Sequence, residues 1–110
     1  MITIRETKTI SNWKRLEREV ARKLGGKRIT RGADFGVSAG DVESIPGTLS
    51  DLFSIECKYR TNFPVLVRDG LKQAKEYDGN RIPLLVLKEK GMNGEIVCLK
   101  LDDLVELLDD

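Results

Sequence analysis

A stripe of apolar residues gives the chain its clearest local pattern. The stripe consists of Trp13, Leu16, Val20 and Leu24. Intervals of three to four residues place such side chains on one face of an α-helix. Ser11 and Asn12 are good residues to begin this helix, and the pair Gly25-Gly26 is suited to end it. The pattern therefore predicts an amphipathic helix that must bury one face against another element.

The next segments have the patterns of strands. Residues 41–45 and 52–59 alternate polar and apolar side chains on either side of the turn signal Pro46-Gly47, which predicts a β-hairpin. The glycine-rich segment before it, residues 27–40, is predicted to be a binding loop with a short strand near Ile29.

The second half of the chain repeats this alternation of helix and strand. A helix is predicted over about residues 67–77, with Leu71 and Ala74 facing inward. The continuous apolar run 82–87 predicts a strand that is covered on both faces. A further strand over 96–99 and a closing helix over 101–108 complete the order.

This order predicts an α/β fold in which helices flank a mixed central β-sheet. The length of 110 residues suits a single domain spanning 1–110. No apolar run approaches the roughly 18 residues of a membrane span, so we expect no membrane partner. The two cysteines lie in strand-like stretches rather than in a disulfide framework, and we expect a reduced, cytoplasmic protein.

The chain contains no histidine. This absence removes Ser-His-Asp and Cys-His nucleophiles and imidazole metal ligands. Two cysteines cannot form a four-thiolate zinc site. Any chemistry must therefore depend on carboxylates, amines or hydroxyls.

Charge is distributed unevenly behind a net charge of +1. Residues 1–31 carry ten basic and three acidic side chains, whereas the remainder carries nine basic and fifteen acidic ones. A basic N-terminal third is expected to face phosphates, with a solvated basic helix as the alternative.

Two acids and an amine are candidates for a common site. Side chains alternate between the faces of a strand, so Glu56 and Lys58 share one face, opposite Phe53, Ile55 and Cys57. A hairpin register that brings Asp41 beside Glu56 would place two carboxylates together. A shared divalent cation relieves their repulsion, and oxygen ligands suit Mg²⁺ or Mn²⁺. The alternative is an exposed cross-strand salt bridge.

The order of these motifs resembles the PD-(D/E)xK nuclease superfamily, most closely its archaeal-type and phage Holliday junction resolvases. The similar segments are 17–26 for the first helix, 40–43 for the first motif, 55–58 for the second and 73–77 for the following helix. The resemblance covers roughly residues 13–87 and implies a restriction-endonuclease-like core. Two features depart from the resolvase pattern: Arg31-Gly32 replaces a serine-glycine pair, and Gly40 replaces the usual proline.

The resemblance also implies residue roles. Asp41 and Glu56 would bind the metal directly, the Cys57 carbonyl would be a further ligand, and Glu17 would reach the metal through water. Lys58 would be the catalytic amine. Gln73 could orient the scissile phosphate or be an ordinary solvated helix residue. Glu17 could likewise be a plain surface acid, and Glu19 is the rival acid, about 200° away around the helix.

Basic side chains around the loop are the candidate phosphate contacts. They are Lys14, Arg15, Arg18, Lys27, Arg28 and Arg31. Only six aromatic residues are available for base stacking, so single-strand recognition is less favoured than duplex binding. Among them, Trp13, Phe53 and Phe63 are expected in a core or an interface.

Together these features predict a Mg²⁺-dependent endonuclease that resolves four-way DNA junctions as a homodimer. One alternative is another nuclease of the same superfamily, of restriction or repair type. A second is a catalytically inert nucleic-acid-binding domain of the same fold, and a third is a small interaction module whose acids are merely solvated.

Overall fold

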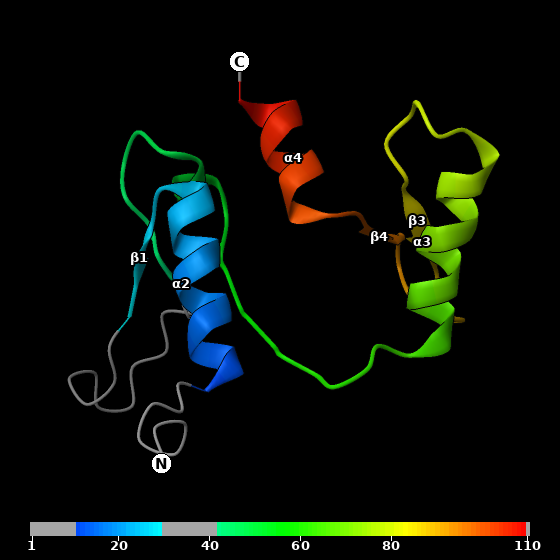
Figure 1. Cartoon of the computed structure of the whole chain (residues 1–110), viewed down its shortest axis with the longest axis horizontal. Coiled ribbons are helices and arrows are strands. Elements are labelled where there is room, and N and C mark those ends of the chain that lie inside the picture. The colour runs from blue at the N-terminus through cyan, green and yellow to red at the C-terminus, as the bar shows by residue number, and fades with distance from the viewer. Residues whose placement is uncertain (1–10, 30–41, 110) are drawn as a thin grey trace, which may run out of the picture. The chain divides into compact units, whose positions relative to one another are not determined.

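The computed structural model describes residues 11–29 and 42–109 (Figure 1). The chain divides into two compact units, Met1–Tyr59 and Arg60–Asp110, and each is described by itself. The described residues combine helices with two small antiparallel sheets, so the chain is broadly α/β. The assignment of residues 1–110 to one domain stays a prediction.

The first unit is built on helix α2, Asn12–Leu24. Its ends match the sequence signals. Ser11 precedes it in an extended conformation, and Gly25 follows it in the left-handed region at a φ of 78°. The Gly26 N–H donates to the Ala21 carbonyl at 2.8 Å, the bond that closes a Schellman motif. The predicted helix is confirmed at both ends.

Helix α2 packs on a short antiparallel sheet, which runs alongside it in Figure 1. Strand β1, Lys27–Arg28, pairs with strand β2, Val42–Glu43, so that Lys27 lies opposite Glu43 and Arg28 opposite Val42. Among the described residues, three of α2 and one of β2 form the buried apolar core of this unit. They are Val20, Ala21, Leu24 and Val42.

A one-turn 3₁₀ helix, η1, Leu49–Leu52, covers the end of this core. Ser50 on η1 is fully buried, and its hydroxyl accepts a hydrogen bond from the Ile45 N–H at 2.9 Å. The Thr48 and Ser50 hydroxyls lie 2.6 Å apart, and Ser44 donates to the Ser50 carbonyl at 3.1 Å. These bonds satisfy the polar groups that the turn buries.

The predicted hairpin of residues 41–45 with 52–59 is wrong. Strand β2 pairs with β1, and residues 53–60 form neither helix nor strand. Burial along 53–58 nevertheless alternates as expected, with Phe53, Ile55 and Cys57 partly buried and the residues between them exposed. The alternation was correctly inferred, whereas the strand partner was not.

The second unit contains helix α3, Val65–Tyr77, strands β3, Leu85–Leu87, and β4, Ile96–Cys98, and helix α4, Leu101–Leu108. The strands pair antiparallel with Val86 opposite Val97. Helix α3 packs on β3, where Gly70 allows a close approach: a Cβ at this position would lie 2.7 Å from a Leu85 methyl carbon.

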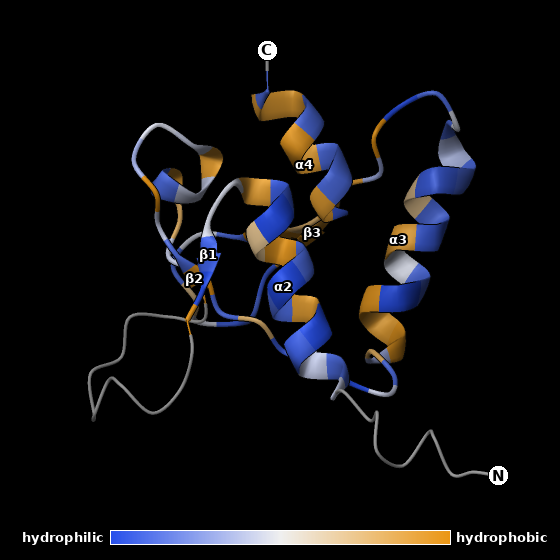
Figure 2. Ribbon diagram, turned by 60° about the vertical axis from the view of Figure 1, so that its left-hand side comes forward, coloured by the Kyte–Doolittle hydropathy of each residue, from blue (hydrophilic) through white to orange (hydrophobic). Residues whose placement is uncertain are grey.

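The predicted helices and strands of this unit are therefore confirmed, with shifted ends. Figure 2 shows hydrophobic and hydrophilic residues interleaved along α2, α3 and α4, as expected for amphipathic helices. Asp102 and Asp103 occupy the first turn of α4, where the helix dipole favours negative charge.

Two predictions about the sheet fail. The run 82–87 is not covered on both faces, because Ile82, Leu84 and Val86 are all exposed. The described strands form two separate pairs rather than one mixed central sheet. Within ranges 11–29 and 42–109, no helix is both long and apolar enough to span a bilayer.

Candidate functional site

A buried ion pair joins α2 to β1. The Arg28 Nε donates to the Glu17 Oε1 at 2.7 Å, and the two side chains are only 15% and 9% exposed, respectively. Burial in a low-dielectric environment strengthens such a pair, but it also makes each charge costly without the other. Glu17 is thus held in the interface between the helix and the sheet.

The ring of Trp13 lies next to the Glu17–Arg28 ion pair, and the three side chains form a cluster. Trp13 lies one helical turn before Glu17, and the Arg28 Cζ is 6.0 Å from its ring centroid. The Lys14 Nζ is 5.4 Å from the same ring. Cation–π contacts at these distances favour the observed positions of both cations. Trp13 itself stays partly exposed, which places the cluster at the edge of the core.

The orientation of the two helix acids agrees with the helical geometry. Glu17 points inward, whereas Glu19 is half-exposed and forms an ion pair with Arg22 one turn further on. The alternative of Glu17 as a plain surface acid is therefore wrong. A buried, paired carboxylate serves structure as well as it would serve chemistry, so the orientation alone does not assign a catalytic role.

Glu56 and Lys58 lie side by side in the extended segment after η1. The Lys58 Nζ is 3.6 Å from the Glu56 Oε2, and the side chains are 78% and 61% exposed, respectively. This geometry matches the expectation that the two side chains share a face. A pair this exposed is screened by water and contributes little to stability. Cys57 between them is partly buried.

The remaining candidates are placed as follows. Asp41 lies outside the described residues, and so does Arg31. Gln73 is exposed on α3, in the second unit. Within the described ranges, no group of three Asp, Glu or Cys side chains is arranged to hold a metal ion. The carboxylate cluster predicted from the sequence is thus not assembled by Glu17, Glu56 and Cys57 alone.

The candidate phosphate contacts separate into two kinds. Arg15, Arg18 and Lys27 are exposed and available to an anion. Lys14 is partly buried over Trp13, and Arg28 is engaged with Glu17. The role of Arg28 as the partner of Glu17 was missed, because residues 11 positions apart on different elements show no local signal.

A second group of functional candidates lies in the other unit and was also missed. Arg68, Lys72 and Lys75 on α3 line a cavity together with Arg81 and Lys100. The i, i+4, i+7 spacing of the three helix residues is visible in the sequence and could have indicated a basic helix face.

We compared the chain with protein families, curated proteins and solved structures. No protein-family model, curated protein or solved structure matches it.

Proposed function

We propose that this chain is a metal-dependent DNA endonuclease that cuts four-way junctions. One structural observation supports the proposal: Glu17 is buried and bonded to Arg28, and Arg28 lies opposite Val42, the residue that follows Asp41 in the chain. The helix acid is therefore directed toward the sheet that contains Val42 and Glu43, the described part of the first acidic motif. This direction supports a site that includes both segments.

In this proposal the acids hold the cation. Asp41 and Glu56 are its direct ligands, with the Cys57 carbonyl, and Glu17 contacts it through water. Oxygen ligands without histidine suit Mg²⁺ or Mn²⁺. When bound, such an ion lowers the pKa of a water ligand and polarises a phosphate. The described residues include no group of three such ligands, and Asp41 lies outside them.

The other side chains act on the phosphodiester directly. The Lys58 ammonium is exposed beside Glu56, where its charge can stabilise the negative charge that develops on the phosphate oxygens. The resemblance to resolvases implies that Gln73 orients the scissile phosphate. Arg15, Arg18 and Lys27 contact neighbouring phosphates and position the duplex without reading its sequence.

A homodimer fits a four-way junction. A chain of this size carries one active site, and two-fold symmetry supplies a second for the symmetric cut. The products are a 5′-phosphate and a 3′-hydroxyl, which the resemblance to resolvases implies.

The decisive assay compares cleavage of an immobile four-way junction, the matching linear duplex and a single strand, each with and without Mg²⁺. We expect cleavage of the junction only, and loss of cleavage in Asp41→Asn and Lys58→Ala. Lys90→Ala, an exposed charge in the second unit, is the matched control and should cleave normally. If none of the three substrates is cut in a metal-dependent way, the proposal that the chain is a nuclease is contradicted. Equal cutting of all three contradicts only the junction preference.

A catalytically inert DNA-binding domain is the second candidate. The observation in its favour is that the described charged side chains of the site are already paired. Glu17 is neutralised by Arg28, and Glu56 and Lys58 form an exposed ion pair with each other. Such a domain binds DNA through its exposed basic residues and does not turn over. Junction binding that survives in wild type, Asp41→Asn and Lys58→Ala alike, with no cleavage in any, identifies this candidate.

A further inference from the structure

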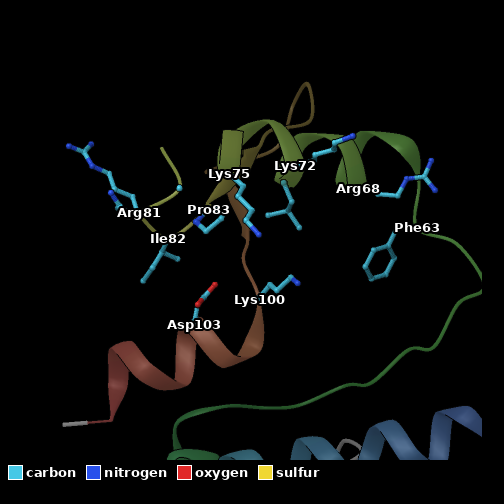
Figure 3. A pocket seen from close by; sticks show the side chains of 12 residues that line it. Phe63, Arg68, Lys72, Lys75, Arg81, Ile82, Pro83, Lys100 and Asp103 are labelled. Atoms are coloured by element: carbon cyan, nitrogen blue, oxygen red, sulfur yellow. The ribbon is translucent and has the colours of Figure 1, made fainter. Parts of the chain in front are cut away.

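The second unit contains a cavity of about 630 Å³ between α3, the segment that leads to β3, and the start of α4 (Figure 3). All of its lining residues belong to this unit. Its volume lies within the range of about 300–1,000 Å³ that is typical of small-molecule sites. The cavity is large enough for a nucleotide-sized ligand.

The lining is strongly basic. Its charged members are Arg68, Lys72, Lys75, Arg81, Lys100 and Asp103, five cations and one acid. Figure 3 shows Lys75 and Lys100 extending into the space between α3 and α4, with Asp103 on α4 facing it. Lys75 and Lys100 belong to separate segments and extend into the same space, and an anion there relieves the repulsion between their charges.

Local acids pair with only two of the five cations. Arg68 and Arg81 have exposed ion pairs with Asp69 at 3.7 Å and Asp78 at 3.2 Å. Among the residues that the structure describes, Lys72, Lys75 and Lys100 have no carboxylate oxygen within the 4.0 Å of an ion pair. The ammonium groups of Lys75 and Lys100, which extend into the cavity, are therefore available to a ligand.

Three basic residues of α3 lie on one side of the helix, and Lys75 among them extends into the cavity. Arg68, Lys72 and Lys75 are spaced i, i+4 and i+7, so they share one side of the helix over a rise of about 10 Å. Gly70 is on the opposite side, in close approach to Leu85 on β3. Because packing at Gly70 holds the helix against the sheet, the basic side faces away from the sheet.

Apolar side chains occupy the rest of the lining. Phe63, Leu71, Ile82 and Pro83 contribute to it, and Phe63 and Ile82 are exposed. An aromatic ring and aliphatic carbons beside a group of cations fit a ligand that joins a planar apolar group to phosphates. Simple carboxylate or sulfate anions lack the planar part.

We propose that this cavity binds the phosphates of a nucleotide, with the base against Phe63 and the neighbouring aliphatic side chains. The nucleotide is either free or part of a nucleic-acid strand, and the shared chemistry is the phosphate next to a base. The site does not rest on the proposed nuclease activity, because its lining contains none of the residues placed at the metal site.

The test is calorimetric titration of the whole chain in EDTA, with ADP, inorganic pyrophosphate, adenosine and the oligonucleotide dT4 as separate probes. We expect ADP and pyrophosphate to bind and adenosine to bind more weakly, with affinity falling as salt rises. Lys75→Ala and Lys100→Ala should each weaken ADP binding about tenfold, since each removes a charge-assisted contact to phosphate. Asp103→Asn should strengthen it by removing repulsion.

Lys90→Ala is the matched control, a basic residue of the same unit outside the cavity, and should bind as wild type does. Binding of dT4 but not ADP, with the same dependence on Lys75 and Lys100, supports a strand as the source of the phosphates. Failure of ADP, pyrophosphate and dT4 to bind overturns the proposal. It is also overturned if Lys75→Ala and Lys100→Ala bind like Lys90→Ala, or if a hexaglutamate peptide binds as tightly as ADP. EDTA prevents turnover, so a failed nuclease assay and a failed binding assay remain distinct.

Discussion

Removal of either member of the Glu17–Arg28 pair should destabilise the first unit strongly, whereas removal of both should not. The two side chains are 9% and 15% exposed and their atoms are 2.7 Å apart. With charge centres about 4 Å apart and an effective dielectric constant of about 20, the attraction is about 4 kcal/mol. Much of this offsets the desolvation of the two ions.

The expected values follow from which charge is left behind. Glu17→Leu leaves the Arg28 guanidinium buried without a partner, and Arg28→Met does the same to the Glu17 carboxylate. Each should lower the free energy of unfolding by about 3 kcal/mol, while the double variant should be within about 1 kcal/mol of wild type. The double-mutant cycle of these variants then gives a large coupling free energy between Glu17 and Arg28, because the effects of the two single substitutions do not add.

Urea unfolding at pH 7 measures these values. Trp13 is the only tryptophan and lies 6.0 Å from the Arg28 Cζ, so its fluorescence reports on this part of the chain. The exposed Glu19–Arg22 pair is the matched control, and its cycle should give a coupling of no more than about 0.5 kcal/mol. If the two cycles give equal coupling, the reasoning from burial is refuted.

Three further predictions concern packing and chemistry. Gly26→Ala should destabilise the protein by about 1–3 kcal/mol, because its Cβ would lie 2.8 Å from the Glu43 carbonyl oxygen. Gly79→Ala is the control: its Cβ would have no atom within 4 Å, so the same urea titration should show almost no change. Leu24→Ala should cost about 2–5 kcal/mol because the side chain is in the core, and a thermal midpoint unchanged from wild type would contradict its burial. Lys58→Ala should leave the unfolding midpoint unchanged because its side chain is exposed, while junction cleavage falls; unchanged cleavage would exclude the lysine from the chemistry.

Much of the local structure could be predicted from the sequence. The helix that ends at Gly25-Gly26 was predicted at both ends, because the apolar periodicity and the left-handed glycine that follows it are local features of the chain. The inward direction of Glu17 follows from helical periodicity, and the alternation over 53–58 follows from extended backbone geometry. These are short-range properties, so neighbouring residues suffice to determine them.

Strand pairing and the neighbours of the site depended on the tertiary structure. Val42 could pair with either of two segments, and the sequence pattern favoured 52–59, whereas the fold pairs it with Arg28. That choice brings Arg28 to Glu17, and it leaves Glu56 and Lys58 in solvent. The free energy that selects a partner strand comes from packing between residues distant in the chain, and no local pattern encodes it.

The sequence by itself therefore determined where the helices lie, to within a few residues at their ends, and which side chains share a face. Only the tertiary structure decided that Arg28 neutralises Glu17. It also decided that basic residues of α3 line one cavity together with Arg81 and Lys100. The physical reason is range: hydrogen bonds and backbone preferences act over one or two turns, whereas burial and charge pairing depend on which distant segments the core brings together.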